Sequence, residues 1–252
     1  MELPPSAPLR VDLFGGRVAF FGGSFDPPHQ GHLAIARAAR DALRLDSVVF
    51  APVGAQPLKP LGSSAGFDDR VAMTRLAIAK DAGFSVSLVD APRIPAAPNY
   101  TIDSLIQLRG LLPPASDLYC LIGADSFLSM SRWHRAAEIP FVAPLIVAAR
   151  PGQSLDDLAA ALPAGLRLDP GHLDSDRPDF GPGIPAGALE RRFLRDDKGR
   201  TSPLYLLPSL HFDISASQIR AEIHAGPATA AESSQVLPAA VLDYIRAHGL
   251  YR

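Results

Sequence analysis

The feature that most constrains this chain is a regular alternation of short apolar strands with amphipathic helices. In the first unit, Arg17–Phe21 is an apolar run that ends at two glycines, and residues 30–44 carry apolar side chains on one helical stripe. Further strands are predicted at 47–53, 84–89, 118–122 and 145–149, and helices at 68–80, at 101–109 and in segments through Glu138. Apolar strands that alternate with helices are typical of a parallel sheet covered on both faces. The sequence therefore predicts an α/β fold, a doubly wound parallel sheet with helices on both faces.

The rest of the chain is expected to complete a single domain over residues 1–252. A strand is predicted at 204–207, and helices are predicted at 215–224 and 238–248. Residues 1–16 contain several prolines and are expected to form a loose leader. A chain of this length buries a sizeable core without disulfides or a structural metal.

Residues 151–203 differ from the rest of the chain. They are rich in Pro, Gly and Asp and carry the charged cluster Glu190–Arg200, with a short helix expected at Leu155–Leu162. We expect a long surface insertion, because charge runs are usually solvated. An alternative stays open, in which Arg191, Arg192 and Arg195 belong to a lid or partner site and contact anions.

Composition and charge disfavour several classes of protein. The chain has 24 basic and 26 acidic residues, a net charge of −2, and so lacks the basic excess of a duplex nucleic-acid binder. Its single cysteine, Cys120, excludes an intramolecular disulfide and fits a reducing compartment. The apolar run Ile139–Ala149 is too short to cross a bilayer as a helix. We expect a cytoplasmic protein with no nucleic-acid partner and no membrane partner.

The segment after the first predicted strand has the features of a phosphate site. It runs from Gly22 to His32 and has the sequence GGSFDPPHQGH. Glycines at a strand-to-helix turn let a phosphate approach the backbone closely, and the start of the helix offers N–H groups and a positive dipole end. His29 and His32 lie three residues apart, so both can face one ligand and stabilise charge during phosphoryl transfer.

Other interpretations of this segment stay open at this point. The glycines and prolines would also suit a turn with no ligand. The H-x-x-H spacing would suit a zinc pair, although no convincing third ligand is evident.

The string GSFDPPHQGH resembles the signature G-[ST]-F-D-P-x-H-x-G-H of the nucleotidyltransferase superfamily. Members join a phosphate-bearing substrate to a nucleoside triphosphate and release pyrophosphate. The resemblance implies a Rossmann-like sheet and catalytic roles for His29 and His32. It also implies that ATP is bound by Gly22, Gly23, Ser24 and Phe25.

A second motif, ISASQIR, occupies Ile214–Arg220. Ser215 and Gln218 form a capping-box pattern that starts a helix, and Arg220 follows one turn inside it. A plain capped helix with a surface arginine is the alternative. The motif resembles the superfamily element I-S-[ST]-[ST]-x-I-R, which holds the triphosphate. This implies that Ile214, Ser215 and Ser217 bind ATP and that Arg220 acts in catalysis, although Ala216 departs from the usual residue.

Two further elements narrow the resemblance to the bacterial nicotinate-nucleotide adenylyltransferases. Gly123, Asp125 and Trp133 match the pattern G-x-D-x7-W, in which the acid is expected to bind the ATP ribose and the tryptophan the pyridine ring. PNYT at 98–101 resembles the element P-S-Y-T, with Asn99 in place of serine. Backbone N–H groups around Tyr100 and Thr101 are then expected to receive the nicotinate carboxylate. Core packing of Trp133 and a plain helix cap at Thr101 are the competing interpretations.

Three basic residues complete the set of expected substrate contacts. Lys59 falls where the family has a basic loop, Arg70 is a similar candidate, and Arg150 resembles the family's R-P turn. A solvated side chain is the alternative for Lys59 and Arg70.

The resemblance implies an enzyme that joins nicotinate mononucleotide and ATP to give deamido-NAD and pyrophosphate, with Mg²⁺ carried on the ATP phosphates. No dedicated metal ligands are expected. The alternatives are an adenylyltransferase for nicotinamide mononucleotide or phosphopantetheine, and a nucleotide-binding regulator without catalysis. Whether the chain forms a homo-oligomer stays open.

Overall fold

The computed structural model describes residues 16–58, 62–148, 155–169, 189–207, 215–226 and 236–252. The predicted leader apart from Gly16 lies outside these ranges, as do parts of 151–203. Lys59, Arg150 and Ile214 also lie outside them. Within the described residues, no helix combines the length and apolar character needed to cross a membrane.

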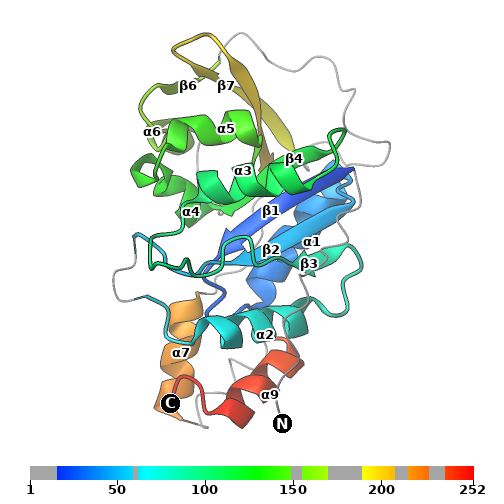
Figure 1. Ribbon diagram of the computed structural model, residues 1–252, viewed down its shortest axis with the longest axis vertical. Helices are drawn as coiled ribbons and strands as arrows, with labels where there is room; N and C mark the ends of the chain where they lie inside the picture. Colours follow the sequence, from blue (N-terminus) through cyan, green and yellow to red (C-terminus); the bar gives the residue numbers. More distant parts are fainter. Residues whose placement is uncertain (1–15, 59–61, 149–154, 170–188, 208–214, 227–235) are drawn as a thin grey trace.

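The described strands form one eight-stranded sheet (Figure 1). In chain order they are β1 (Arg17–Gly23), β2 (Ser47–Pro52), β3 (Phe84–Val86), β4 (Asp117–Gly123), β5 (Leu145–Ala148), β6 (Leu166–Leu168), β7 (Glu190–Asp196) and β8 (Thr201–Leu207). Their order across the sheet is β3-β2-β1-β4-β5-β8-β7-β6. Neighbours from β3 to β8 are parallel, whereas β7 is antiparallel to β8 and to β6.

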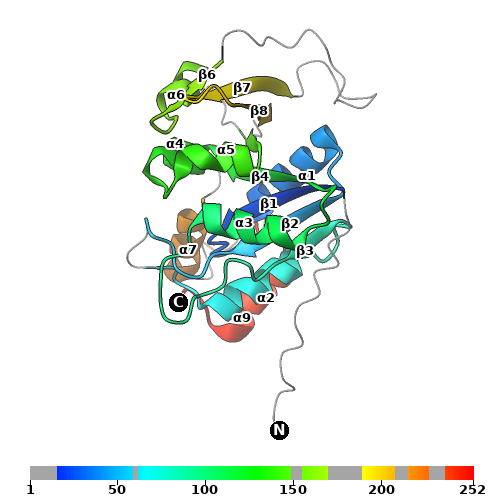
Figure 2. The same cartoon turned by 45° about the horizontal axis from the view of Figure 1, so that its top comes forward.

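Helices cover both faces of this sheet. The α-helices are α1 (Gln30–Leu43), α2 (Phe67–Ile78), α3 (Thr101–Leu111), α4 (Ala124–Leu128), α5 (Ile139–Val142), α6 (Leu155–Ala160), α7 (Ala216–Ala225) and α9 (Ala239–His248). Ala19 and Phe21 of β1 belong to a buried cluster with α1, α2, α7 and α9, while Val18 and Phe20 belong to a second cluster with α3, α4, α5 and α6. This alternation follows from the period of two along a strand. Helices α2 and α9 lie side by side in both views (Figures 1 and 2).

The predicted α/β fold is confirmed, with the predicted strands and helices found close to their expected bounds. One strand is shorter than expected: the run 84–89 is extended only over Phe84–Val86. The Ser87 hydroxyl accepts a hydrogen bond from the N–H of Val89 at 3.2 Å, and such a local bond turns the chain out of the strand. The prediction of a single domain over the whole chain stays a prediction.

The charged cluster at Glu190–Arg200 is also more regular than expected. Strand β7 forms within it and extends the sheet, and Leu194 is fully buried. Several of its charges are paired, since Arg195 contacts Asp169 at 2.6 Å and Arg192 contacts Glu190. Strands β6 and β7 lie at one end of the sheet, far from α7 in both views (Figures 1 and 2). The part of 151–203 that the structure describes therefore gives no support to a lid.

The topology also fixes where a ligand can enter. Strand β1 lies between β2 and β4: the chain runs from β1 through β2 to β3 on one side and then crosses to β4 on the other. A crevice forms at the carboxyl ends of the strands at such a switch point, and ligands of doubly wound sheets bind there.

Candidate functional site

A cavity of about 710 Å³ opens at the carboxyl ends of β1 and β4. Its volume is that of a site for a small-molecule ligand. The predicted site residues that line it are Gly22, Gly23, Ser24, Phe25, His29, His32, Tyr100, Thr101, Gly123, Asp125, Trp133, Ser215, Ser217 and Arg220. Segments far apart in the sequence thus meet in one cavity.

The loop after β1 turns sharply into α1. Phe25 has a φ of 47°, an uncommon value for a residue with a side chain, and its ring is buried. The ring lies with its edge toward His32, with 5.1 Å between the ring centroids. A side chain at Gly22 would approach the Phe20 ring to 2.8 Å, so a glycine is required there. Tight packing therefore holds this loop against the sheet.

The rings of the two histidines lie in contact at the start of α1, with their planes tilted by 33°. Their ring centroids are 3.8 Å apart, and the backbone N–H of His29 donates to Nδ1 of His32 at 3.2 Å. Because Nδ1 of His32 accepts, the proton of its neutral form lies on Nε2, which is then a hydrogen-bond donor. Burial lowers the pKa of His29 to about 4, so His29 is neutral near pH 7. The pair therefore supplies hydrogen bonds rather than a fixed double positive charge.

Helix α7 brings the second predicted motif to the same cavity. The Ser215 hydroxyl accepts from the N–H of Gln218 at 3.1 Å, which confirms the predicted capping box. Arg220, one turn later, donates to the backbone carbonyl of Asp26 at 2.8 Å and to the Ser217 hydroxyl at 3.2 Å. The guanidinium thus connects the start of α7 to the loop after β1.

Asp26 joins this loop to two more parts of the chain. Its buried carboxylate accepts from the N–H groups of Ser64 at 2.6 Å and Ala65 at 3.0 Å. It also accepts from the hydroxyl of Tyr251, in the C-terminal tail, at 2.7 Å. Burial and this carboxylate raise the pKa of Tyr251, so the hydroxyl stays a donor. The C-terminus accordingly lies beside α7 in both views (Figures 1 and 2).

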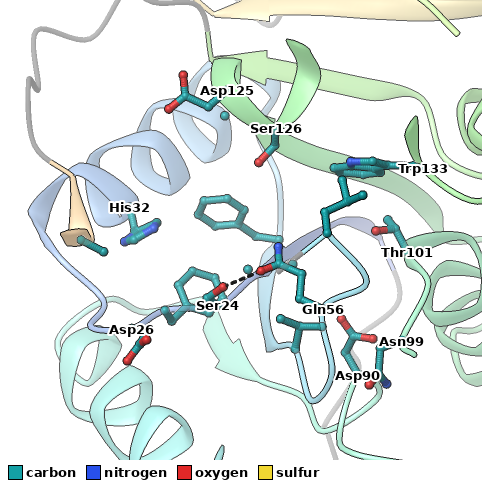
Figure 3. Close-up of a pocket in the computed structure, with 18 of the residues that line it drawn as sticks. Ser24, Asp26, His32, Gln56, Asp90, Asn99, Thr101, Asp125, Ser126 and Trp133 are labelled. Atoms are coloured by element: carbon teal, nitrogen blue, oxygen red, sulfur yellow. Dashed lines mark hydrogen bonds between the residues drawn. The ribbon is translucent and has the colours of Figure 1, made fainter. Parts of the chain in front are cut away.

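We call His29, His32, Ser24 and Arg220 the histidine end of the cavity. The ring end consists of Tyr100, Thr101, Trp133 and His134. In Figure 3, His32 and Trp133 lie on opposite sides, with a hydrogen bond from Ser24 to Gln56, 3.0 Å long, between them.

At the ring end, aromatic side chains surround the start of α3. Trp133 is partly buried against the core and also lines the cavity. Its position is therefore compatible both with core packing and with the predicted ligand contact. The rings of Tyr100 and His134 are 4.4 Å apart between centroids. Tyr100 is the N-cap of α3 and has no side-chain cap. The N-termini of α1, α3 and α7 therefore all border the cavity, and each favours an anionic ligand group.

Arg70 is the exception among the described site predictions, because it does not line the cavity. Its guanidinium is buried and donates to the carbonyls of Ser24 at 2.7 Å, Val53 at 2.8 Å and Ala65 at 3.2 Å. It supports the loops that form the site rather than making the expected contact with substrate. Burial lowers the pKa of this guanidinium, and the carboxylate of Asp26 opposes that effect.

Several cavity residues were not predicted from the sequence. They include Asp26, Gln56, Asp90, Asn99 and His134. Asn99 was noted only as a departure from a family pattern, and none of the sequence motifs includes His134. The signal available for His134 was its position beside Trp133.

Comparisons with known proteins agree with the fold. Residues 20–222 match the family model described as cytidylyltransferase-like, a class of nucleotide-binding proteins. A protein of Gloeobacter violaceus is 35% identical over 94% of this chain and 97% of its own length, and one of Stenotrophomonas maltophilia is 38% identical over 92% and 96%. Both are named probable nicotinate-nucleotide adenylyltransferase. The chain belongs to this family of nicotinate-nucleotide adenylyltransferases.

A solved structure supports the fold. It is the Plasmodium falciparum nicotinic acid mononucleotide adenylyltransferase complexed with NaAD, with a TM-score of 0.63 and 16% identity. The superposition covers 94% of this chain and 97% of that one.

Proposed function

We propose that the protein transfers the adenylyl group of ATP to nicotinate mononucleotide, giving deamido-NAD and pyrophosphate in NAD biosynthesis. The observation that carries the proposal is one cavity with two unlike ends. The histidine end offers phosphate donors, and the ring end offers Trp133 beside a helix N-terminus. The relatives named as nicotinate-nucleotide adenylyltransferases support the same reaction.

At the histidine end, an oxygen of the mononucleotide phosphate attacks the α-phosphorus of ATP. The bond from this phosphorus to the bridging oxygen of the β-phosphate breaks, and pyrophosphate leaves with that electron pair. A phosphate monoester is a competent nucleophile near neutral pH, so the chain needs to supply no general base. Its contribution is positioning and charge stabilisation, with Nε2 of His32 donating to the phosphates.

The remaining donors at this end are proposed to bind different phosphates of ATP. Arg220 and the start of α7 would hold the β- and γ-phosphates, which become the pyrophosphate. The backbone from Gly22 to Phe25 and the hydroxyl of Ser24 would add donors at the α-phosphate. Gly123 and Asp125 border the cavity after β4, where the carboxylate suits a ribose hydroxyl pair.

At the ring end, Trp133 is proposed to stack on the pyridine ring. The N–H groups at the start of α3, from Tyr100 and Thr101 onward, would receive the nicotinate carboxylate. An amide has no negative charge for this helix end to stabilise, so the geometry favours the acid. Lys59 and Arg150, which lie outside the described residues, keep their predicted substrate contacts as part of the proposal.

Magnesium is proposed to enter as the ATP complex. No three His, Cys, Asp or Glu side chains gather into a metal site within the described part of the chain. Mg²⁺ prefers phosphate oxygens and water, and it would neutralise charge on the triphosphate.

The test is pyrophosphate release from ATP and Mg²⁺ with three candidate substrates in separate reactions. They are nicotinate mononucleotide, nicotinamide mononucleotide and phosphopantetheine. Release with nicotinate mononucleotide alone is the expected result. Equal release with both pyridine nucleotides would remove the preference for the acid, and release only with phosphopantetheine would overturn the substrate assignment. If none of the three substrates gives pyrophosphate release while the protein still binds ATP, a nucleotide-binding regulator would be favoured.

A further inference from the structure

Three loops meet directly beneath the ring end of the cavity. They follow β2 (Gly54–Gln56), follow β3 (Asp90–Pro92) and precede α3 (Asn99–Tyr100). The backbone N–H of Gly54 donates to the carbonyl of Asp90 at 2.7 Å. A side chain at Gly54 would lie 2.4 Å from the backbone nitrogen of Pro92, so these loops pack backbone against backbone.

Asn99 connects all three loops. Its Oδ1 accepts from the N–H of Ala55 at 2.8 Å, and its Nδ2 donates to the carbonyl of Ala91 at 2.9 Å. Its own backbone N–H donates to the carbonyl of Ala55 at 2.9 Å. The side chain is buried with both its acceptor and a donor satisfied, and Figure 3 shows it beside Asp90, below Gln56 and Thr101. A serine side chain is too short, with its donor and acceptor on a single oxygen, to reach both Ala55 and Ala91.

A second buried bond fixes the first turn of α3 to the same loops. The hydroxyl of Ser104 donates to the carboxylate of Asp90 at 2.7 Å. Burial raises the pKa of Asp90, and hydrogen bonds from Ser104 and Asn99 partly offset this. The start of α3 is therefore held on both sides, by Asn99 before it and by Ser104 within it.

A chain of hydrogen bonds also connects Asn99 to the histidine end of the cavity. Ala55, which Asn99 holds through two bonds, precedes Gln56, and Gln56 accepts from the hydroxyl of Ser24. The start of α3 is thus positioned by one buried amide, whereas Gln56 is also held from the histidine end by its bond with Ser24.

We propose that Asn99 is a positioning residue that sets the start of α3 for the ring-bearing substrate and so determines the affinity for that substrate. The inference rests on the proposed function, because it assumes that Tyr100 and Thr101 receive the nicotinate group. Asn99 acts through these backbone groups and does not itself need to touch the substrate.

Steady-state kinetics of Asn99→Ala test the proposal first. The KM for nicotinate mononucleotide should rise about tenfold, while kcat and the KM for ATP stay within about twofold. Asn99→Asp keeps the acceptor for Ala55 but loses the donors to Ala91 and Asp90 and places a second carboxylate beside Asp90, so its KM should rise at least as far as in Asn99→Ala. Ser202→Ala is the matched control, because Ser202 is buried and donates to the Pro140 carbonyl at 2.5 Å but does not line the cavity. This control should leave both KM values unchanged.

A second measurement uses the unmodified chain and does not depend on a variant that folds. Asn99 is the single asparagine and Trp133 the single tryptophan. Labelling with ¹⁵N-asparagine therefore gives one pair of side-chain amide resonances, and Trp133 fluorescence reports occupancy of the ring end. Saturation with nicotinate mononucleotide should quench the fluorescence and shift the Asn99 amide pair, whereas a non-hydrolysable ATP analogue alone should leave that pair in place.

The outcomes separate the two proposals. Fluorescence quenching without any shift of the Asn99 amide, together with an unchanged KM in Asn99→Ala, would overturn the positioning role and leave the proposed function intact. A proportional fall of kcat for all substrates with unchanged KM values would also overturn it, since that result indicates loss of active protein. If nicotinate mononucleotide neither quenches Trp133 nor supports turnover in the unmodified protein, the proposed function fails and the inference fails with it.

Discussion

The histidine end of the cavity is built largely by one continuous segment, Gly22–His32, whereas the ring end is assembled from loops that are distant in the sequence. At the histidine end, the contact between His29 and His32 is made within one helical turn. At the ring end, Asn99 bonds to Ala55, 44 residues away, and the tilted rings of Tyr100 and His134 are in contact. The two histidines proposed to bind the phosphates are thus held by local contacts. The residues proposed to bind the ring are held by contacts between distant parts of the chain. The two ends should therefore respond differently to substitution, with changes in kcat at one and in KM at the other.

The largest expected effect is at the histidine end, in His32→Ala. Loss of one preorganised donor to the reacting phosphates should remove about 3–4 kcal/mol of transition-state stabilisation, a fall of roughly 10²–10³ in kcat. Turnover under saturating substrates measures it. The matched control is His224→Ala, because His224 is exposed on α7 and does not line the cavity. Unchanged turnover in His32→Ala would remove the proposed mechanism.

The buried histidine of this pair, His29, predicts a pH dependence of stability. Burial lowers the pKa of His29 from 6.5 to about 4, so the unfolded chain binds more protons than the folded chain between these values. This contribution to the free energy of unfolding is fully present above about pH 6.5 and is lost as the pH falls toward 4. Over this pH range the lowered pKa of His29 changes the free energy of unfolding by about 3 kcal/mol in total.

Urea unfolding of the unmodified protein and His29→Gln over this pH range measures this contribution. The difference in unfolding free energy between the two proteins should grow with pH up to about 6.5 and then stay constant. Parallel curves for the two proteins across the range would show that His29 is not buried as a neutral group.

The same contrast explains what the sequence predicts and what it does not. The loop after β1 and the capping box at Ser215 are predicted because each signal lies within a few adjacent residues. The role of Asn99 depends on partners in two other loops, which no local pattern specifies. Arg70 was expected to contact substrate because of its charge, but only the packed structure shows that its donors serve three backbone carbonyls. Strand β7 was missed because its charged side chains suggest a solvated loop, whereas pairing with β8 buries Leu194.

A smaller effect, confined to KM, is expected at the ring end in Trp133→Ala. Loss of stacking on the pyridine ring should cost about 2 kcal/mol, a rise of roughly thirtyfold in the KM for nicotinate mononucleotide. The KM for ATP and kcat should change far less. Trp133→Phe keeps an aromatic face and should recover most of the affinity. A normal KM in Trp133→Ala would show that the ring binds elsewhere, whereas a collapse of kcat would show that the two ends are not separable.

The smallest effect concerns the C-terminal tail, which connects to the histidine end through one long-range contact. The hydroxyl of Tyr251 donates to Asp26, 225 residues away, and Arg220 donates to the carbonyl of the same aspartate. Tyr251→Phe should lower the free energy of unfolding by about 1.5 kcal/mol, because a partly buried hydrogen bond to a carboxylate is lost.

Tyr251→Phe should also raise the KM for ATP, because Asp26 then holds Arg220 less firmly, while the KM for nicotinate mononucleotide stays unchanged. Tyr244→Phe is the matched control, since the Tyr244 hydroxyl donates to Asp69 at 2.9 Å and does not line the cavity. That variant should lose some stability and keep both KM values. If Tyr251→Phe behaves in the same way, the tail only stabilises the fold, and the histidine end depends on its local contacts alone.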